Sequence, residues 1–277
     1  MRAGAFSPNH IGNDTAIFNL TADALRKRGC QVNVYSEEEF REAEITEPVV
    51  MAMCREAASI VKLKRLEDEG HKVVNSGYGI DNCTRERMTR LLLGNGVPYP
   101  DSLIVNTNES VKKEMEEGGF NRVWIKRGDF QTIHREDVSY CRHPEEAQEV
   151  LHEYFYRGIQ RAVINRHLVG DLIKFYGVGG TDFFYWFYPF EGGHSKYGYE
   201  LINGVSKGIE FDEEQLHDIC RRASEVLDVR VYGGDCVISS EGEIRLIDFN
   251  DWPSFAPCRD EASKYIAKSI INFANGK

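Results

Sequence analysis

Short apolar runs alternate with longer amphipathic stretches along the first third of the chain. Runs with the character of β-strands cover residues 2–6, 31–35, 49–53 and 72–75. Between them, apolar positions recur every three or four residues and predict helices at residues 14–28 and 56–69. Strands joined through helices build a parallel sheet, so the pattern predicts an α/β domain over residues 1–80.

Two prolines, Pro98 and Pro100, introduce the next part of the chain. They follow a helix predicted at residues 84–93. Beyond them the pattern predicts strands at 102–105, 122–126 and 137–141 and helices at 109–117 and 144–156. We therefore expect a second, α+β lobe over residues 81–160.

The last part of the chain, residues 161–277, is richer in strands. The predicted strands cover residues 162–168, 172–178, 183–190, 236–239 and 244–249, and helices are expected at 212–228 and 261–274. The run 183–190 is strongly aromatic, and we interpret it as core rather than as a ligand platform. The fold class is therefore α/β, with α+β lobes.

Composition and charge limit the partners and the compartment. With 34 Lys+Arg against 44 Asp+Glu the net charge is -10, and the basic residues are scattered, which argues against nucleic acid and anionic membranes as partners. The seven cysteines form no CxxC pair and predict free thiols in a reducing compartment. Neither a signal peptide nor an apolar run of membrane-spanning length is evident, so we expect a cytoplasmic protein.

Two aspartates are predicted to face each other across a hairpin near the C-terminus. If Glu241 and Gly242 form a two-residue turn, the register pairs Asp235 with Asp248. Alternation along the second strand then places Asn250 on the same face. The same alternation predicts an apolar floor made of Val237, Ile244 and Leu246.

Opposed carboxylates repel each other, so this arrangement favours a bound cation. Ligand sets made only of oxygen atoms suit Mg²⁺, with Mn²⁺ as an alternative ion. A polar strand end followed by a turn is the simpler interpretation of residues 248–251. Three oxygen ligands on one face favour the metal site.

Other common site types find little support in the sequence. The turn at residues 7–12 reads SPNHIG and lacks the GxGxxG of a dinucleotide-binding Rossmann domain. The eight histidines show no HxH or HxxxH spacing, which argues against a histidine metal site. No serine lies in a GxSxG turn, and no Cys/His pair has a recognisable spacing, so covalent catalysis by the protein is not expected.

The hairpin resembles the metal-binding end of the ATP-grasp superfamily, particularly ligases similar to ribosomal-protein glutamate ligase and glutathione synthetase. The shared pattern is a Gly-x-Asp strand, a hairpin, and a strand ending in acidic-x-Asn shortly before a proline, here Pro253. The resemblance implies an ATP-grasp fold behind a Rossmann-like pre-ATP-grasp domain. It also implies Mg²⁺ held between the β/γ-phosphates of ATP and the side chains of Asp235, Asp248 and Asn250.

Two further segments resemble phosphate-binding parts of the same superfamily. Residues 84–100 resemble a segment in which a lysine contacts phosphate, and Arg87 lies at or near that lysine position. Residues 123–126 resemble the strand whose terminal lysine, here Lys126, binds the α/β-phosphates. The family's lid is glycine-rich, whereas residues 127–135 contain one glycine. Candidates to cover the phosphates instead are Arg127, Gln131 and His134.

Residues 162–174 resemble the family's hinge strand, which contacts the nucleoside. The resemblance implies backbone contacts to adenine from Asn165, Arg166, His167 and Leu168. It further implies that Asp171 reaches the ribose and that Lys174 faces phosphate. Because Arg166 stands where an acidic residue is common, backbone atoms are expected to read the base.

The resemblance implies an ATP- and magnesium-dependent carboxylate-amine ligase, or carboxylate-thiol ligase, that works through an acyl phosphate. Lys126, Lys174 and Arg87 would stabilise the developing charge. A small molecule or peptide would supply the carboxylate, with contacts expected from residues 7–13 and 53–55 and from Ser254 and Arg259. Two alternatives remain, a small-molecule kinase and a nucleotide-binding protein with weak or lost catalysis. The oligomeric state stays open, with a homodimer among the options.

Overall fold

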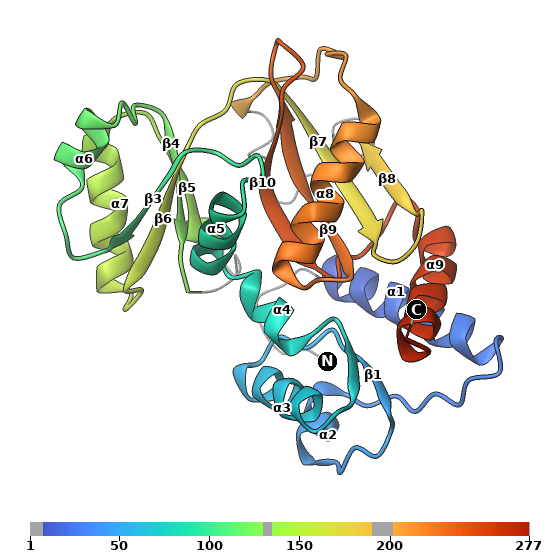
Figure 1. The fold of residues 1–277 in the computed structure, drawn as a ribbon. Helices are drawn as coiled ribbons and strands as arrows, with labels where there is room; N and C mark the ends of the chain where they lie inside the picture. The colour runs from blue at the N-terminus through green and yellow to red at the C-terminus, as the bar shows by residue number, and fades with distance from the viewer. Residues whose placement is uncertain (1–7, 130–134, 190–201, 277) are drawn as a thin grey trace.

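The computed structural model of the chain describes residues 8–129, 135–189 and 202–276. Consecutive parts of the chain build separate sheets, and helices pack against each of them (Figure 1). The order of elements follows the sequence-based prediction closely. The differences fall in the front part and in the C-terminal hairpin.

The front part packs helices around a short parallel sheet. Strand β1 (Val49–Met51) pairs in parallel with β2 (Lys72–Val74) and is joined to it through α3 (Ala57–Asp68). Helices α2 (Glu37–Glu42) and α4 (Gly77–Asn82) flank this unit. Its core contains Phe40, Ile60, Leu63, Leu66, Val73 and Ile80. The β-α-β arrangement predicted for residues 49–75 is confirmed.

The two other strands predicted in the front part have different outcomes. Residues 2–6 lie outside the described residues. The strand predicted at residues 31–35 is wrong, because this segment is irregular and lies apart from the β1-β2 ladder. Two of its side chains instead form hydrogen bonds with the Glu47 carboxylate, to which Asn33 Nδ2 donates at 2.6 Å and the Tyr35 hydroxyl at 3.1 Å. Since Val34 is half-exposed, the alternation in this segment does not mark a buried face.

The central lobe is a four-stranded antiparallel sheet with helices on one face. Its strands, in the spatial order β3-β6-β4-β5, are β3 (Ser102–Asn106), β6 (Arg161–Arg166), β4 (Val123–Arg127) and β5 (Val138–Cys141). Helices α6 (Lys112–Glu117) and α7 (Pro144–Tyr156) bury the face that carries Val123, Ile125 and Ile164. By alternation, Lys126 and Asn165 point to the opposite face.

The C-terminal lobe is a second four-stranded antiparallel sheet. In the spatial order β10-β9-β7-β8, its strands are β10 (Ile244–Asp251), β9 (Val231–Ile238), β7 (Asp171–Val178) and β8 (Phe184–Phe187). Helix α8 (Glu213–Leu227) covers one face of this sheet and shares its core with α5 (Arg85–Gly94). The side chains of Phe184, Trp186 and Tyr188 pack against that core, which confirms the core interpretation of the aromatic run for these residues.

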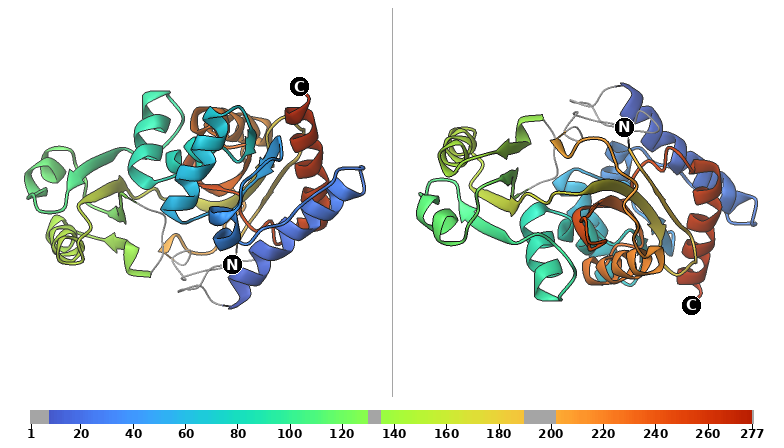
Figure 2. Two further views of the ribbon diagram at one scale, coloured as in Figure 1. Left: turned by 90° about the horizontal axis from the view of Figure 1, so that it is seen from below. Right: turned by 90° about the horizontal axis from the view of Figure 1, so that it is seen from above.

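Helices from the two ends of the chain fasten the front part to this sheet. Helix α1 (Pro8–Arg26) lies beside α9 (Arg259–Ala274), as Figure 2 shows from two sides, and their apolar residues share one core. The buried Asn75 side chain adds a polar link, because it exchanges two 2.7 Å hydrogen bonds with the backbone of Val231 at the start of β9. Within the described residues, no helix is long and apolar enough to cross a membrane.

The β9-β10 hairpin pairs Asp235 with Asp248, as predicted, but by a different route. Near the turn, Ile244 pairs with Ile238, one position away from the register of a two-residue turn. A β-bulge at Ile247 then shifts the ladder by one residue, and Asp248 comes to face Asp235. The two deviations cancel at this pair.

The bulge also corrects the predicted apolar floor. Because one extra residue interrupts the alternation, Leu246 and Asp248 point to opposite faces of the sheet. Ile244, Leu246 and Phe249 pack into the core beneath α8. Of the predicted floor residues, Val237 alone keeps its place on the Asp235 face, two positions along β9.

Candidate active site

Two carboxylates, an amide and an ammonium group lie together on one face of the C-terminal sheet. Asp248 on β10, Asp235 on β9 and Lys174 on β7 are direct neighbours across the strands. Lys174 Nζ lies 2.8 Å from Asp235 Oδ1. Asn250 lies on the same face of β10, and its Nδ2 donates to Asp248 Oδ2 at 3.3 Å. The three predicted metal ligands are therefore brought together.

Arg85, which the sequence analysis did not single out, completes this cluster. Its guanidinium makes two bonds to the Asp248 carboxylate, from Nη1 to Oδ1 and from Nη2 to Oδ2, the latter at 3.0 Å. The predicted residue Arg87 instead points outwards, with its side chain 57% exposed and 3.8 Å from Asp81. The sequence did contain the signal, because Arg85, Met88, Thr89 and Leu92 follow the helical spacing of one face, and all four are buried.

Lys126 connects the two four-stranded sheets. It is 8% exposed, and its Nζ donates to the backbone oxygen of Ile247 at 2.8 Å, at the bulge on β10. The neighbouring amide of Leu246 donates to the oxygen of Pro98 at 3.0 Å. The outer edge of β10 therefore forms hydrogen bonds with Lys126, the predicted phosphate lysine, and with the segment that links α5 to β3.

The charges in this cluster shift one another's pKa values. Burial lowers the pKa of Lys126 to about 8, helped by the nearby charge of Arg85 and opposed by Asp248 and Asp235. Burial would raise the pKa of Asp248, but Arg85 and Lys126 more than offset this effect, so its pKa lies below the ordinary value. Asp248 is therefore a carboxylate at neutral pH and is suited to binding cations.

The hinge residues use much of their bonding capacity within the protein. The His167 amide donates to the oxygen of Arg122 at 2.8 Å, and its Nδ1 accepts from Trp124 at 3.1 Å. The Arg166 guanidinium donates to the oxygens of Gly118 and Gly119 and lies 4.7 Å from the Phe120 ring centroid. Its side chain therefore turns towards the edge of the central lobe and is bonded within the protein. Leu168 is half-buried in the loop after β6.

Asn165 and Asp171 lie at the two ends of the hinge and have different surroundings. Asn165 is 2% exposed and donates to Ser102 Oγ at 2.8 Å, while its Oδ1 has no hydrogen-bond partner among the described residues. Asp171 is 3% exposed, and both carboxylate oxygens accept backbone amides, from Lys207 at 2.8 Å and Ile209 at 2.9 Å. These bonds anchor the segment before α8 and compete with the expected ribose contact.

The expected lid is described only at its start. Arg127 pairs with Asp129 at 2.8 Å and lies 3.5 Å from Asp137, so its charge is held within the central lobe. Gln131 and His134 lie outside the described residues.

The donor atoms of the predicted metal site determine which ion it could hold. Across residues 8–129, 135–189 and 202–276, no three Cys, His, Asp or Glu side chains gather where they could hold a metal. The predicted set has two carboxylates and one amide, and both carboxylates contact basic side chains. Oxygen donors of this number suit Mg²⁺ when nucleotide phosphates and water complete its shell. The three residues fit a site in which phosphate and water oxygens supply the remaining ligands, and they do not supply a complete ligand shell by themselves.

Arg55 and Arg259 are two of the residues that were expected to contact substrate. Arg55, in the loop after β1, makes an ion pair with the fully buried Asp251 and donates from Nη2 to its backbone oxygen at 3.1 Å. Arg259 donates to Asn13 Oδ1 at 2.7 Å. Both arginines thus tie the front part of the chain to the region that follows Asn250. Ser7, the first residue of the expected 7–13 contact segment, lies outside the described residues.

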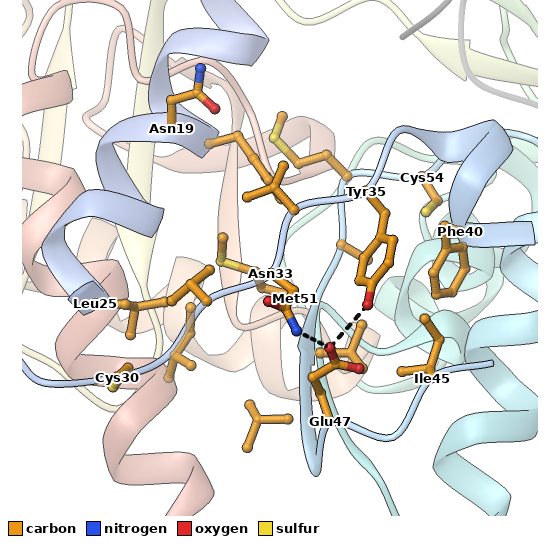
Figure 3. A pocket seen from close by; sticks show the side chains of 18 of the residues that line it. Asn19, Leu25, Cys30, Asn33, Tyr35, Phe40, Ile45, Glu47, Met51 and Cys54 are labelled. Atoms are coloured by element: carbon orange, nitrogen blue, oxygen red, sulfur yellow. Dashed lines mark hydrogen bonds between the residues drawn. The ribbon is translucent and has the colours of Figure 1, made fainter. Parts of the chain in front are cut away.

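The front part also contains a cavity of about 590 Å³ (Figure 3). Helices α1 and α9, residues 30–37 and residues 45–54 line it, mostly with apolar groups, and the bonds from Asn33 and Tyr35 to Glu47 lie along its wall. None of the predicted nucleotide or metal residues lines it. We place no ligand in this cavity.

Comparisons by sequence find no match, neither among protein-family models nor among curated proteins. Comparison of the structure does find solved structures that are similar. D-alanine--D-alanine ligase from Bacillus anthracis is similar with a TM-score of 0.67 at 12% identity, over 98% of this chain and 95% of that one. D-cycloserine synthetase DcsG gives a TM-score of 0.66 at 12% identity, over 96% of each chain.

The ATP-grasp ligase PsnB, in complex with a minimal precursor, gives a TM-score of 0.62 at 16% identity over 96% of each chain. All three likenesses span nearly the whole molecule on both sides, so they concern its entire architecture and not one shared lobe. At sequence identities this low, the structural similarity establishes the fold and does not identify the substrate. The chain has the ATP-grasp fold.

Proposed function

We propose that the chain is an ATP- and magnesium-dependent ligase that joins a carboxylate to an amine through an acyl phosphate. The observation that carries this proposal is the convergence of three basic and three oxygen-bearing side chains from two sheets and helix α5. The basic residues are Arg85, Lys126 and Lys174, and the oxygen ligands are Asp235, Asp248 and Asn250. Phosphoryl transfer needs this combination, because its catalysis is mainly positioning and charge stabilisation.

The side chains divide the work in the proposed reaction. Lys126 neutralises the α/β-phosphates, and Lys174 and Arg85 stabilise the γ-phosphoryl group as it moves to the substrate carboxylate. Asp235, Asp248 and Asn250 would hold Mg²⁺, which would supply charge neutralisation for the phosphates. The amine then attacks the acyl phosphate, the carbon-nitrogen bond forms, and inorganic phosphate leaves.

The neighbours' printed substrates suggest where to look for the carboxylate. The D-alanine--D-alanine ligases are named for an amino acid, DcsG is named for D-cycloserine, and PsnB is described with a precursor peptide. Some of these neighbours were solved with ATP or with Mg and ADP. We therefore propose an amino acid or a peptide carboxylate as the acceptor of the phosphoryl group.

A product assay tests this function. The protein is incubated with ATP, Mg²⁺ and mixtures of amino acids and short peptides, and ADP, inorganic phosphate and new amides are measured. Release of ADP and phosphate that requires both an acid and an amine supports the ligase. Phosphate retained on an organic product would instead identify a kinase. Nucleotide protection against unfolding without any turnover would identify a binding protein.

A matched pair of variants ties activity to the site. Asp248→Asn removes the charge of a proposed metal ligand. Asp101→Asn removes the same charge from an exposed residue whose partner is Arg166. Turnover is expected to fall at least about a hundredfold in the first variant, as for loss of charge stabilisation in a reaction centre, and to stay unchanged in the second. Equal turnover in the two would remove Asp248 from the proposed site.

A further inference from the structure

Arg85 holds both carboxylate oxygens of Asp248, a proposed metal ligand. The two side chains are only 6% and 19% exposed, so water screens the pair weakly. A fork of two parallel bonds is the strongest geometry that an arginine and a carboxylate can adopt. Oδ1 of Asp248 also accepts from the Phe249 amide at 2.9 Å and Oδ2 from Asn250 Nδ2 at 3.3 Å, so a divalent ion that binds this carboxylate competes with the guanidinium for its lone pairs.

The same guanidinium carries a donor that the protein leaves unsatisfied. Arg85 Nε is buried and has no hydrogen-bond partner among the described residues. Buried N–H groups without an acceptor are costly and usually mark a place for water, an ion or a ligand. Lys126 lies close enough for the two positive charges to act on each other. An anionic oxygen between these residues would satisfy the Nε–H and relieve the repulsion.

We propose that Arg85 is a nucleotide-operated gate of the metal site, an inference that rests on the proposed function. Without nucleotide, Arg85 holds Asp248 and excludes the divalent ion by competition. A phosphate oxygen beside Lys126 draws the guanidinium away, and the Asp248 carboxylate then binds the ion that accompanies the phosphates. Arginine suits this role better than lysine, because its planar fork can hold both carboxylate oxygens at once.

Metal binding measured apart from catalysis tests the gate. Mn²⁺ serves as the probe, because its electron paramagnetic resonance signal reports the free ion, and its affinity is measured with and without ADP. Arg85→Gln removes the gate. Arg90→Gln is the matched control, because it removes the same charge from the same helix, where the side chain is 58% exposed. Circular dichroism and thermal unfolding check that each variant folds.

The gate predicts that Arg85→Gln binds Mn²⁺ at least about tenfold more tightly than the wild-type protein in the absence of ADP, as expected for removing a charged hydrogen-bond competitor. It also predicts that Arg85→Gln binds ADP more weakly and that Arg90→Gln changes neither affinity. Should Arg85→Gln fail to fold, Arg85→Lys decides the matter, since its single-point donor should give an intermediate gain in Mn²⁺ affinity.

Two outcomes would count against the inference, and they can be told apart. Equal Mn²⁺ affinity of the wild type and the Arg85 variants without ADP, together with intact ADP-dependent Mn²⁺ binding, overturns the gate and leaves the proposed function standing. Absence of Mn²⁺ binding by wild-type protein even with ADP overturns the proposed function itself, and the gate with it.

Discussion

The buried ion pair between Arg55 and Asp251 should contribute strongly to stability. Asp251 is fully buried, and the Arg55 side chain is 15% exposed. Replacing Arg55 by Met keeps much of the side-chain volume but leaves the carboxylate without its guanidinium partner. Removing one member of a buried pair typically lowers the free energy of unfolding by about 3–5 kcal/mol.

The chain length converts this cost into a thermal shift. With an unfolding entropy of about 2.1 cal/mol/K per residue, a chain of 277 residues loses about 1.7 °C for each kcal/mol. Arg55→Met should therefore lower the melting temperature by about 5–9 °C. Differential scanning calorimetry measures the shift directly, and urea unfolding monitored by tryptophan fluorescence measures the free energy independently.

Arg41→Met is the matched control for this prediction. Arg41 pairs with Glu56 in the same part of the chain, but the two side chains are 28% and 57% exposed. Such partly exposed pairs contribute about 0–1 kcal/mol, so the melting temperature should fall by no more than about 2 °C. The double variant Arg55→Met with Asp251→Leu should recover part of the loss, because no lone charge remains buried. If Arg55→Met costs no more than Arg41→Met, the pair does not fasten the front part to β10.

Three further predictions concern the site. Because the pKa of Lys126 is lowered to about 8, its ammonium loses its proton as the pH rises through that value. ATP affinity measured by titration calorimetry should therefore fall by up to about tenfold per pH unit above 8. Lys126→Arg should flatten this dependence, and a flat wild-type profile would exclude a contact between Lys126 and ATP. Asp248→Asn should weaken Mg²⁺-dependent ATP binding at least about tenfold, whereas Asp101→Asn should not weaken it. An unchanged magnesium dependence of ATP binding in Asp248→Asn would refute the assignment of Asp248 as a metal ligand. Asp171→Asn should lower the free energy of unfolding in urea by about 1–3 kcal/mol, since it weakens two bonds to backbone amides. Weaker ATP binding without loss of stability would favour the ribose role instead.

Local patterns in the sequence determined most of the elements. Apolar periodicity placed the β-α-β unit at residues 49–75 and the strands of both four-stranded sheets close to their observed bounds, except for β9, which was predicted at 236–239 and spans Val231–Ile238. These features depend on residues two to four positions apart, which share a face of a strand or helix, so they can be read without the partner surface. The strand predicted at residues 31–35 was wrong because a strand needs a neighbouring strand to complete its ladder. Local alternation does not show whether such a neighbour is present.

The tertiary structure alone decided how charges are partnered. Arg85 meets Asp248, Arg55 meets Asp251, and Lys126 reaches Ile247, each across more than a hundred residues of sequence. No local pattern encodes such pairings, because they depend on how separate sheets and helices pack. The bulge at Ile247 belongs to the same class, since it turns Asp248 away from the core that Leu246 occupies. The sequence by itself determined which residue types are present for the proposed nucleotide chemistry, and the packing of sheets, helices and loops decided which of them meet.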